Sequence, residues 1–147
     1  MPNPAHRRID EYDRAVPEIG IDYAFMKEKG NEETLTIVVM KDRDTKTISS
    51  DVVELKGRGI DGTVDRIIEN IQRLGYKKVI LKSDQEPALV NLINGVIEAR
   101  DDSTIPECSP VGESQSNGVV ERAVRSVKDQ VRTLRLALQG RVKRRVP

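Results

Sequence analysis

Apolar and polar residues alternate with a period of two in the first structured part of the chain. In residues 19–25, Ile19, Ile21, Tyr23 and Phe25 alternate with Gly20, Asp22 and Ala24. This alternation predicts a β-strand that carries a carboxylate, Asp22, on its less apolar face. Residues 34–40 form the most β-prone run and predict a strand buried on both faces, and residues 45–55 predict a third, more polar strand. The short turns between the three strands predict an antiparallel meander.

The periodicity changes to that of a helix after residue 60. Apolar residues at helical spacing predict one helix over 61–74 and another over 87–97, with a short strand at 77–81 between them. Residues 104–108 predict a fifth strand. This order predicts an α/β fold in which two parallel strands extend the meander into a five-stranded mixed sheet flanked by helices.

A flexible loop over residues 109–118 precedes a predicted long helix over 119–139, roughly 30 Å long. One stripe of this helix is apolar, comprising Val120, Val124, Val127, Val131, Leu134 and Leu138. A second stripe begins at a carboxylate and continues with cations, comprising Glu121, Arg125, Lys128, Arg132 and Arg135. We expect the helix to dock by the apolar stripe and to present the cations to a phosphate backbone.

The length of 147 residues favours one domain with short ends. We expect a tail or linker at 1–17, a folded core at 18–140 and a basic tail at 141–147. No apolar run is long enough to span a bilayer, and the polar start does not resemble a signal peptide, so we expect an intracellular protein with no membrane partner.

The net charge of +1 conceals an uneven distribution. Residues 122–147 contain nine cations and one acid, which gives that segment a charge of +8 and leaves −7 for the rest. A basic end on an acidic body favours a polyanionic partner, although a solvated charged helix would show the same pattern.

Three carboxylates occupy positions that suggest a shared metal site. Asp22 lies within the first strand, Asp84 lies at the carboxyl end of the fourth, and Glu121 lies in the first turn of the predicted long helix. The chain has one Cys and one His, too few for a zinc site, and clustered oxygen ligands favour Mg²⁺ or Mn²⁺. Taken singly, each acid has an ordinary alternative as a helix cap, a helix-terminus charge or an ion-pair partner.

Three sequence blocks resemble those of retroviral and retrotransposon integrase cores. They are Ile-Asp-Tyr at 21–23, Lys-Ser-Asp-Gln-Glu at 82–86, and Ser-Gln-Ser-Asn-Gly-Val-Val-Glu at 114–121. The resemblance covers roughly residues 19–139 and implies an RNase H-like fold. It also implies that Asp22, Asp84 and Glu121 are catalytic residues that hold two Mg²⁺ or Mn²⁺ ions. Glu113 is the alternative third ligand.

The resemblance further implies how nucleic acid binds. It assigns Gln115 to a DNA contact near the scissile bond, and Arg125 and Lys128 to the DNA end of the element. Asn117, Arg132 and Arg135 are further candidate nucleic-acid-binding residues. The expected partners are retroelement DNA ends, target DNA and further copies of the chain in a dimer or tetramer. The family's zinc-binding amino-terminal domain is absent, so we expect a fragment of a larger polyprotein that acts in the nucleus.

The implied activity is DNA integration by two-metal phosphodiester cleavage and strand joining. Two alternatives stay open. An RNase H-like nuclease would only hydrolyse, although the helix over 61–74 offers no additional site acid on its apolar stripe. A catalytically dead nucleic-acid-binding domain of a decayed retroelement would retain DNA binding alone.

Overall fold

The computed structural model describes residues 16–27, 34–53, 61–109 and 114–142, apart from the side chains of residues 61, 114–117 and 142. Three strands come first, β1 (Glu18–Lys27), β2 (Thr34–Asp42) and β3 (Ile48–Val53). They are followed by α2 (Asp61–Arg73), β4 (Val79–Ser83), α3 (Pro87–Ala99), β5 (Thr104–Cys108) and α4 (Ser114–Val142).

The strands form one mixed sheet in the order β3-β2-β1-β4-β5. The pairs β1–β2 and β2–β3 are antiparallel, while β1–β4 and β4–β5 are parallel. This confirms the predicted meander with its two-stranded parallel extension, and β1 lies in the centre of the sheet.

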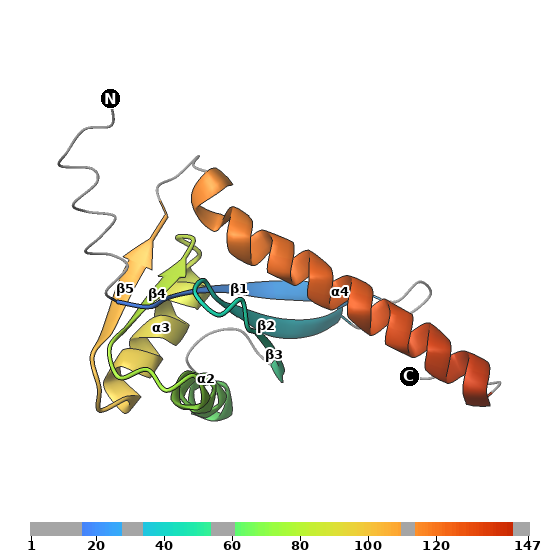
Figure 1. Ribbon diagram of the computed structural model, residues 1–147, viewed down its shortest axis with the longest axis horizontal. Helices are drawn as coiled ribbons and strands as arrows, with labels where there is room; N and C mark the ends of the chain where they lie inside the picture. The colour runs from blue at the N-terminus through green and yellow to red at the C-terminus, as the bar shows by residue number, and fades with distance from the viewer. Residues whose placement is uncertain (1–15, 28–33, 54–60, 110–113, 143–147) are drawn as a thin grey trace.

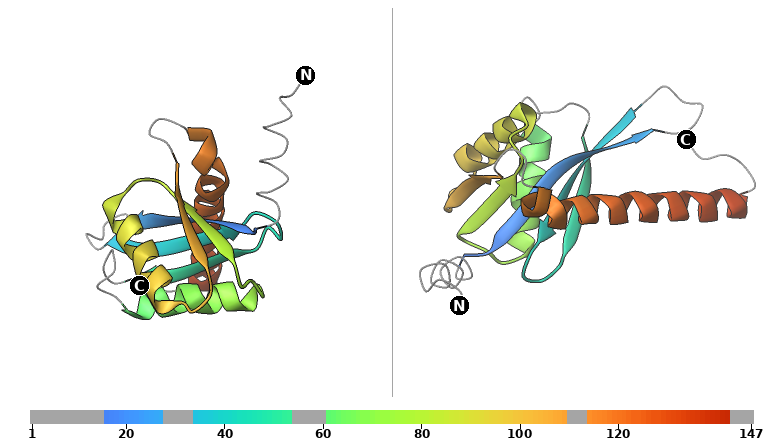
Figure 2. Two further views of the ribbon diagram at one scale, coloured as in Figure 1. Left: turned by 90° about the vertical axis from the view of Figure 1, so that its left-hand side faces the viewer. Right: turned by 90° about the horizontal axis from the view of Figure 1, so that it is seen from above.

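Helices cover both faces of the sheet (Figures 1 and 2). The helices α2 and α3 pack on one face, where alternate residues of β1 such as Ile19 and Ile21 meet Ile67 of α2 and Leu92 of α3. The helix α4 crosses the other face, where Ala24 of β1 joins a smaller cluster. Consecutive residues of β2 are therefore buried on opposite faces, as the sequence predicts.

The long helix differs from its predicted extent. It begins at Ser114, five residues earlier than expected, and reaches Val142. Glu121 consequently lies in the third turn of α4 and not in the first, and the expected flexible loop is already helical from Ser114 onward. Residues 114–118 contain no apolar residue and are mostly weak helix formers, so neither apolar spacing nor propensity marks this start of the helix.

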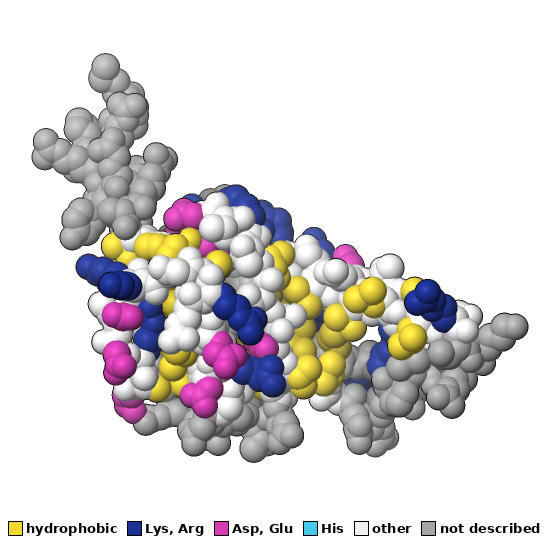
Figure 3. Space-filling view, turned by 60° about the horizontal axis from the view of Figure 1, so that its bottom comes forward, with side chains coloured by type: hydrophobic (Ala, Val, Ile, Leu, Met, Phe, Trp, Pro, Cys, Tyr) yellow, Lys and Arg dark blue, Asp and Glu magenta, His cyan; other side chains and the backbone are white. Residues whose placement is uncertain are grey.

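Only the inner half of the apolar stripe docks on the sheet. Val120 and Val127 are buried, whereas Leu134 is 62% exposed and Leu138 is 45% exposed. The expectation that the whole Val/Leu stripe packs was therefore wrong, because α4 extends past the edge of the described sheet. Figure 3 shows apolar side chains gathered at the surface where the helix leaves the body of the protein. No helix among the described residues is both long and apolar enough to cross a membrane.

Candidate metal and nucleic-acid site

The site lies where β1 and β4 stop pairing. Their parallel register ends with Gly20 opposite Lys82. Asp22 and Asp84 each follow two residues later, so the two carboxylates stand at the same level on neighbouring parallel strands. Since residues two apart share one face of a strand, Asp22 lies with Gly20 on the face that α4 crosses.

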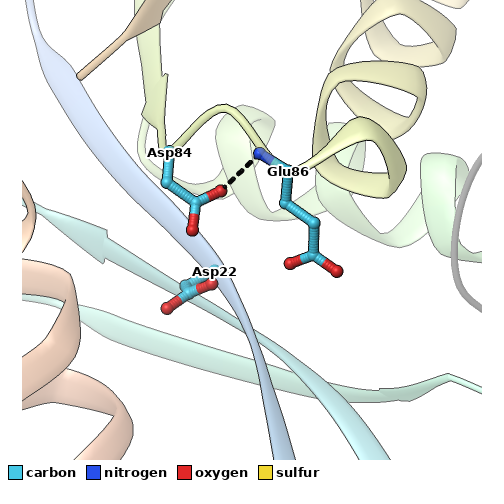
Figure 4. A group of neighbouring side chains, drawn as sticks. All are labelled: Asp22, Asp84 and Glu86. Carbon is cyan, nitrogen blue, oxygen red and sulfur yellow. Dashed lines mark hydrogen bonds between the residues drawn. The ribbon is translucent and has the colours of Figure 1, made fainter. Parts of the chain in front are cut away.

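Three carboxylates converge at this position (Figure 4). One ligand oxygen from each of Asp22, Asp84 and Glu86 lies within 4.8 Å of the others. The backbone N–H of Glu86 donates a hydrogen bond of 2.9 Å to Oδ1 of Asp84, which fixes the turn between β4 and α3. An oxygen-only donor set of this kind suits Mg²⁺ or Mn²⁺.

Glu86 was not identified as a candidate from the sequence. Glu86 belongs to the block at 82–86 that resembles integrase cores, but it lies between a strand and a helix. The periodicity of apolar residues therefore gives no position for its side chain. The available signal was Asp84 itself after a strand, because an Asp side chain favours a turn in which it accepts a hydrogen bond from the backbone two residues on, here at Glu86.

Asp22 is the acid that the fold perturbs most. Its pKa is raised from 3.8 to about 6, chiefly because the carboxyl group is buried and secondly because Asp84, Glu86 and Glu121 place negative charge nearby. A backbone hydrogen bond of 2.8 Å from the N–H of Tyr23 to Oδ1 acts in the opposite direction. A bound cation would relieve both the crowding of charge and the cost of burying it.

Glu121 lies outside the converged group. It is exposed on α4, and the ligand oxygens within 4.8 Å of one another do not include its own. It is close enough, however, for its charge to raise the pKa of Asp22. The expected convergence therefore holds for Asp22 and Asp84, while Glu121 stands at the margin of the site.

The position of Glu121 follows from how α4 sits on β1. Val120 lies over Gly20, where a Cβ added to the glycine would be 3.1 Å from the Cβ of Val120. Further along both elements, Ala123 and Val127 pack with Ala24. Asp22 lies between these two contacts along β1, so the helix turn that carries Glu121 passes beside it. A larger residue at position 20 would push this turn away.

The predicted nucleic-acid residues follow α4 outward from the site. Arg125 and Arg132 are exposed, while Lys128 and Arg135 are half-buried at the edge of the docked face. Arg132 forms an ion pair of 3.6 Å with Asp129 on the exposed surface. Residues 115 and 117 lie in the first turns of α4, but their side chains are outside the described residues, as is residue 113 altogether.

Sequence comparisons find no match: no family model and no curated protein is similar to this chain. Comparison with solved structures does find chains of similar fold. A chain of the simian T-cell lymphotropic virus intasome in complex with the PP2A regulatory subunit B56 gamma superposes with a TM-score of 0.63 at 15% identity over 88% of this chain. The catalytic core domain of BIV integrase gives a TM-score of 0.54 at 22% identity over 84% of this chain.

A further relative is the HTLV-2 integrase catalytic core domain in complex with magnesium, with a TM-score of 0.60 at 16% identity over 82% of this chain in its trimeric form. The fold of this chain is therefore that of retroviral integrase catalytic cores, which is RNase H-like. The chain spans 43% of the matched intasome chain but 70% and 72% of the BIV and HTLV-2 core chains.

Proposed function

We propose that this protein is a polynucleotidyl transferase of the retroelement integrase type, which cleaves DNA ends and joins them to target DNA. The observation that carries the proposal is the placement of Asp22 and Asp84 at one level on the two central parallel strands, on the face that a basic helix crosses. The integrase-core fold supports the same conclusion.

Asp22 and Asp84 would hold a divalent cation between them, and Glu86 and Glu121 are the neighbouring acids available to complete two sites. Two cations bound there would assist formation of the attacking oxyanion and stabilise the charge on the leaving oxygen. The magnesium in the HTLV-2 core supports Mg²⁺ as the ion.

The reaction is a displacement at phosphorus. A water or a DNA 3′-hydroxyl oxygen attacks, losing its proton to solvent, while the bond from phosphorus to the leaving 3′ oxygen breaks and that oxygen takes up a proton. With water as nucleophile the DNA end is trimmed. With the exposed 3′-hydroxyl as nucleophile the end is joined to a second duplex, so one site serves both steps.

Glu121 would join the site when DNA binds along α4. Its side chain is exposed and stands in the same stripe as Arg125 and Lys128. A phosphate backbone neutralising those cations would run toward the carboxylates. Assembly of several copies on DNA is part of the proposal, supported by the dimeric and trimeric forms of the HTLV-2 core.

The decisive test is Asp84→Asn, which is nearly isosteric and removes a ligand charge. We expect end cleavage and strand joining with Mg²⁺ or Mn²⁺ to fall by at least about a thousandfold, in line with the loss of a group that acts in the transition state. Circular dichroism should be unchanged. The matched control is Asp102→Asn, an exposed acid that precedes β5 at the opposite end of the sheet. Full activity of the Asp84 variant would remove this residue from the site.

A hydrolase that does not join strands is the second candidate, because the RNase H-like fold serves both reactions. Two acids of α2, Asp65 and Glu69, are exposed on a helix that covers the other face of the sheet, so these two add nothing to the site. A joining assay with a pre-cleaved DNA end separates the two. Cleavage without any joined product would favour the hydrolase.

A further inference from the structure

A lysine stands on the face of the carboxylate site without pairing with it. Lys82 is the last residue of β4 that pairs with β1. Of its two neighbours, Leu81 belongs to the core on the α2–α3 face and Ser83 is fully buried. Alternation along the strand therefore places Lys82 on the α4 face, beside Gly20 and two residues before Asp84.

The Lys82 ammonium is held by two glutamates on the flanking strands. Its Nζ lies 3.5 Å from Oε1 of Glu18 on β1 and 3.5 Å from Oε1 of Glu107 on β5. Glu18 is itself fixed, because its Oε2 accepts a hydrogen bond of 2.9 Å from Arg43 and its backbone oxygen accepts another from the N–H of Arg43. The side chains of Lys82 and Glu18 are 17% and 20% exposed, so this pair is largely shielded from solvent, whereas Glu107 is 50% exposed.

The clamp holds the ammonium away from Asp22 and Asp84. In register, Glu18 lies two residues before Gly20, whereas Asp22 lies two residues after it, so the glutamate and the aspartate are on opposite sides of Lys82. Among the described residues, no ion pair joins Lys82 to either aspartate. The separation along β4 from Lys82 to Asp84 is about 6.6 Å, which the flexible four-carbon stem of a lysine spans.

We propose that Glu18 and Glu107 are positioning residues that hold Lys82 away from Asp22 and Asp84 and so keep this pair free for a divalent cation. The inference rests on the proposed function. A released ammonium would pair with Asp84 or Asp22. It would compete with the metal ion because both cations use the same carboxylate oxygens. In its held position, the ammonium instead neutralises part of the charge of Glu18 and Glu107.

The test compares Mn²⁺ affinity, measured by the electron paramagnetic resonance signal of free Mn²⁺, in the full 147-residue chain and three variants. Glu18→Gln/Glu107→Gln should weaken binding by about tenfold, the scale expected for a charge at a few ångströms that solvent screens almost as strongly as bulk water does. Adding Lys82→Met to this double variant should restore the wild-type affinity. Lys82→Met alone should bind Mn²⁺ as well as wild type or better.

Loss of the two negative charges of Glu18 and Glu107 could by itself weaken cation binding, without any movement of Lys82. Asp101→Asn/Asp102→Asn, which removes two exposed acids and leaves the clamp intact, is the matched control and should change affinity by less than about twofold. A triple variant that binds as weakly as the Glu18/Glu107 double variant would overturn the proposal, since the effect would not depend on the lysine.

A metal-free crystal structure of the Glu18→Gln/Glu107→Gln variant supplies a readout that needs no metal. We expect the Lys82 ammonium within about 4 Å of an Asp84 or Asp22 oxygen, the range of an ion pair. An ammonium that keeps its wild-type direction would overturn the positioning role. Wild-type protein that binds no Mn²⁺ would instead contradict the proposed function, whatever the position of Lys82 in the variant.

Discussion

The two faces of the sheet are built for different purposes. On the α2–α3 face, Ile21, Leu81 and Leu92 are fully buried in one continuous aliphatic cluster. On the α4 face, the same central strands carry Gly20, Asp22 and Lys82, and the aliphatic cluster is smaller and lies further along β1 and β2. One face supplies the hydrophobic stabilisation, and the other exposes charge in a fixed geometry.

This difference explains how one strand can hold a costly carboxylate. Asp22 on β1 has a raised pKa because it is partly buried beside other acids, which is unfavourable for the metal-free fold. Its neighbours Ile21 and Tyr23 point the other way, into the α2–α3 core. Because side chains alternate along β1, the unfavourable charge of Asp22 lies between two residues whose burial in the core stabilises the strand.

The largest stability effect should come from the α2–α3 face. Leu92 is completely buried, and Leu92→Ala should lower the free energy of unfolding by about 2–5 kcal/mol through lost burial and a cavity. The matched control is Leu138→Ala on the outer half of α4, where the leucine is 45% exposed and the cost should stay below about 0.5 kcal/mol. Urea unfolding measures both. Equal costs would mean that the outer leucine is covered in solution and that the two regions do not differ as described.

Much of this division was predictable from periodicity. The alternation in β1 placed Asp22 opposite Ile21, and the strand–helix order made β1 and β4 neighbours, so the approach of Asp22 and Asp84 followed from the sequence. The helix start was not predictable to within a turn, because residues 114–118 are compatible with both loop and helix. That error moved Glu121 from the first turn of α4 to the third.

Other features depend on geometry that the periodicity of apolar residues does not encode. The exposure of Leu134 and Leu138 depends on where the sheet ends beneath α4, not on the spacing of apolar residues in the helix. The proximity of Glu86 to Asp22 depends on the turn after β4. The pairing of Lys82 with Glu18 and Glu107 joins three strands that are far apart in sequence.

A substitution on the α4 face should change the free energy of unfolding by less, and should raise it instead of lowering it. Because the folded-state pKa of Asp22 is raised to about 6 from 3.8, the native state retains its proton more tightly, and the metal-free protein should lose stability as pH rises between these values. Asp22→Asn removes the charge. At pH 7 without metal we expect it to raise the free energy of unfolding by about 1 kcal/mol, a value reduced for the solvent screening of a partly exposed group.

The measurement for Asp22→Asn is urea unfolding from pH 4 to 8, with a chelator and then with Mn²⁺. Mn²⁺ should stabilise the wild type and reverse the order of the two proteins, since binding to the native state alone adds stability. Asp102→Asn, an exposed acid outside the site, serves as the control and should leave the pH dependence unchanged. A variant that is less stable than wild type at pH 7 without metal would show that the Asp22 charge is not a burden to the fold.

The smallest stability change should accompany a large change in DNA binding. Arg125 is exposed and Lys128 is half-buried on the α4 stripe that leads to the site. Arg125→Gln/Lys128→Gln should change the free energy of unfolding by less than about 0.5 kcal/mol, because neither side chain belongs to the apolar cluster beneath the helix. Each cation that neutralises a phosphate contributes about 0.9 to the slope of log affinity against log salt, so losing two should flatten the slope by nearly two. The matched control is Arg73→Gln/Lys78→Gln. Arg73 is the last residue of α2 and Lys78 precedes β4, and both are exposed.

DNA titrations at several salt concentrations compare the wild type, the Arg125/Lys128 variant and this control. If the Arg125/Lys128 variant keeps the wild-type slope, or if the control loses as much, then the cations of α4 are solvated surface charges, and the phosphate path toward Asp22 and Asp84 must run elsewhere.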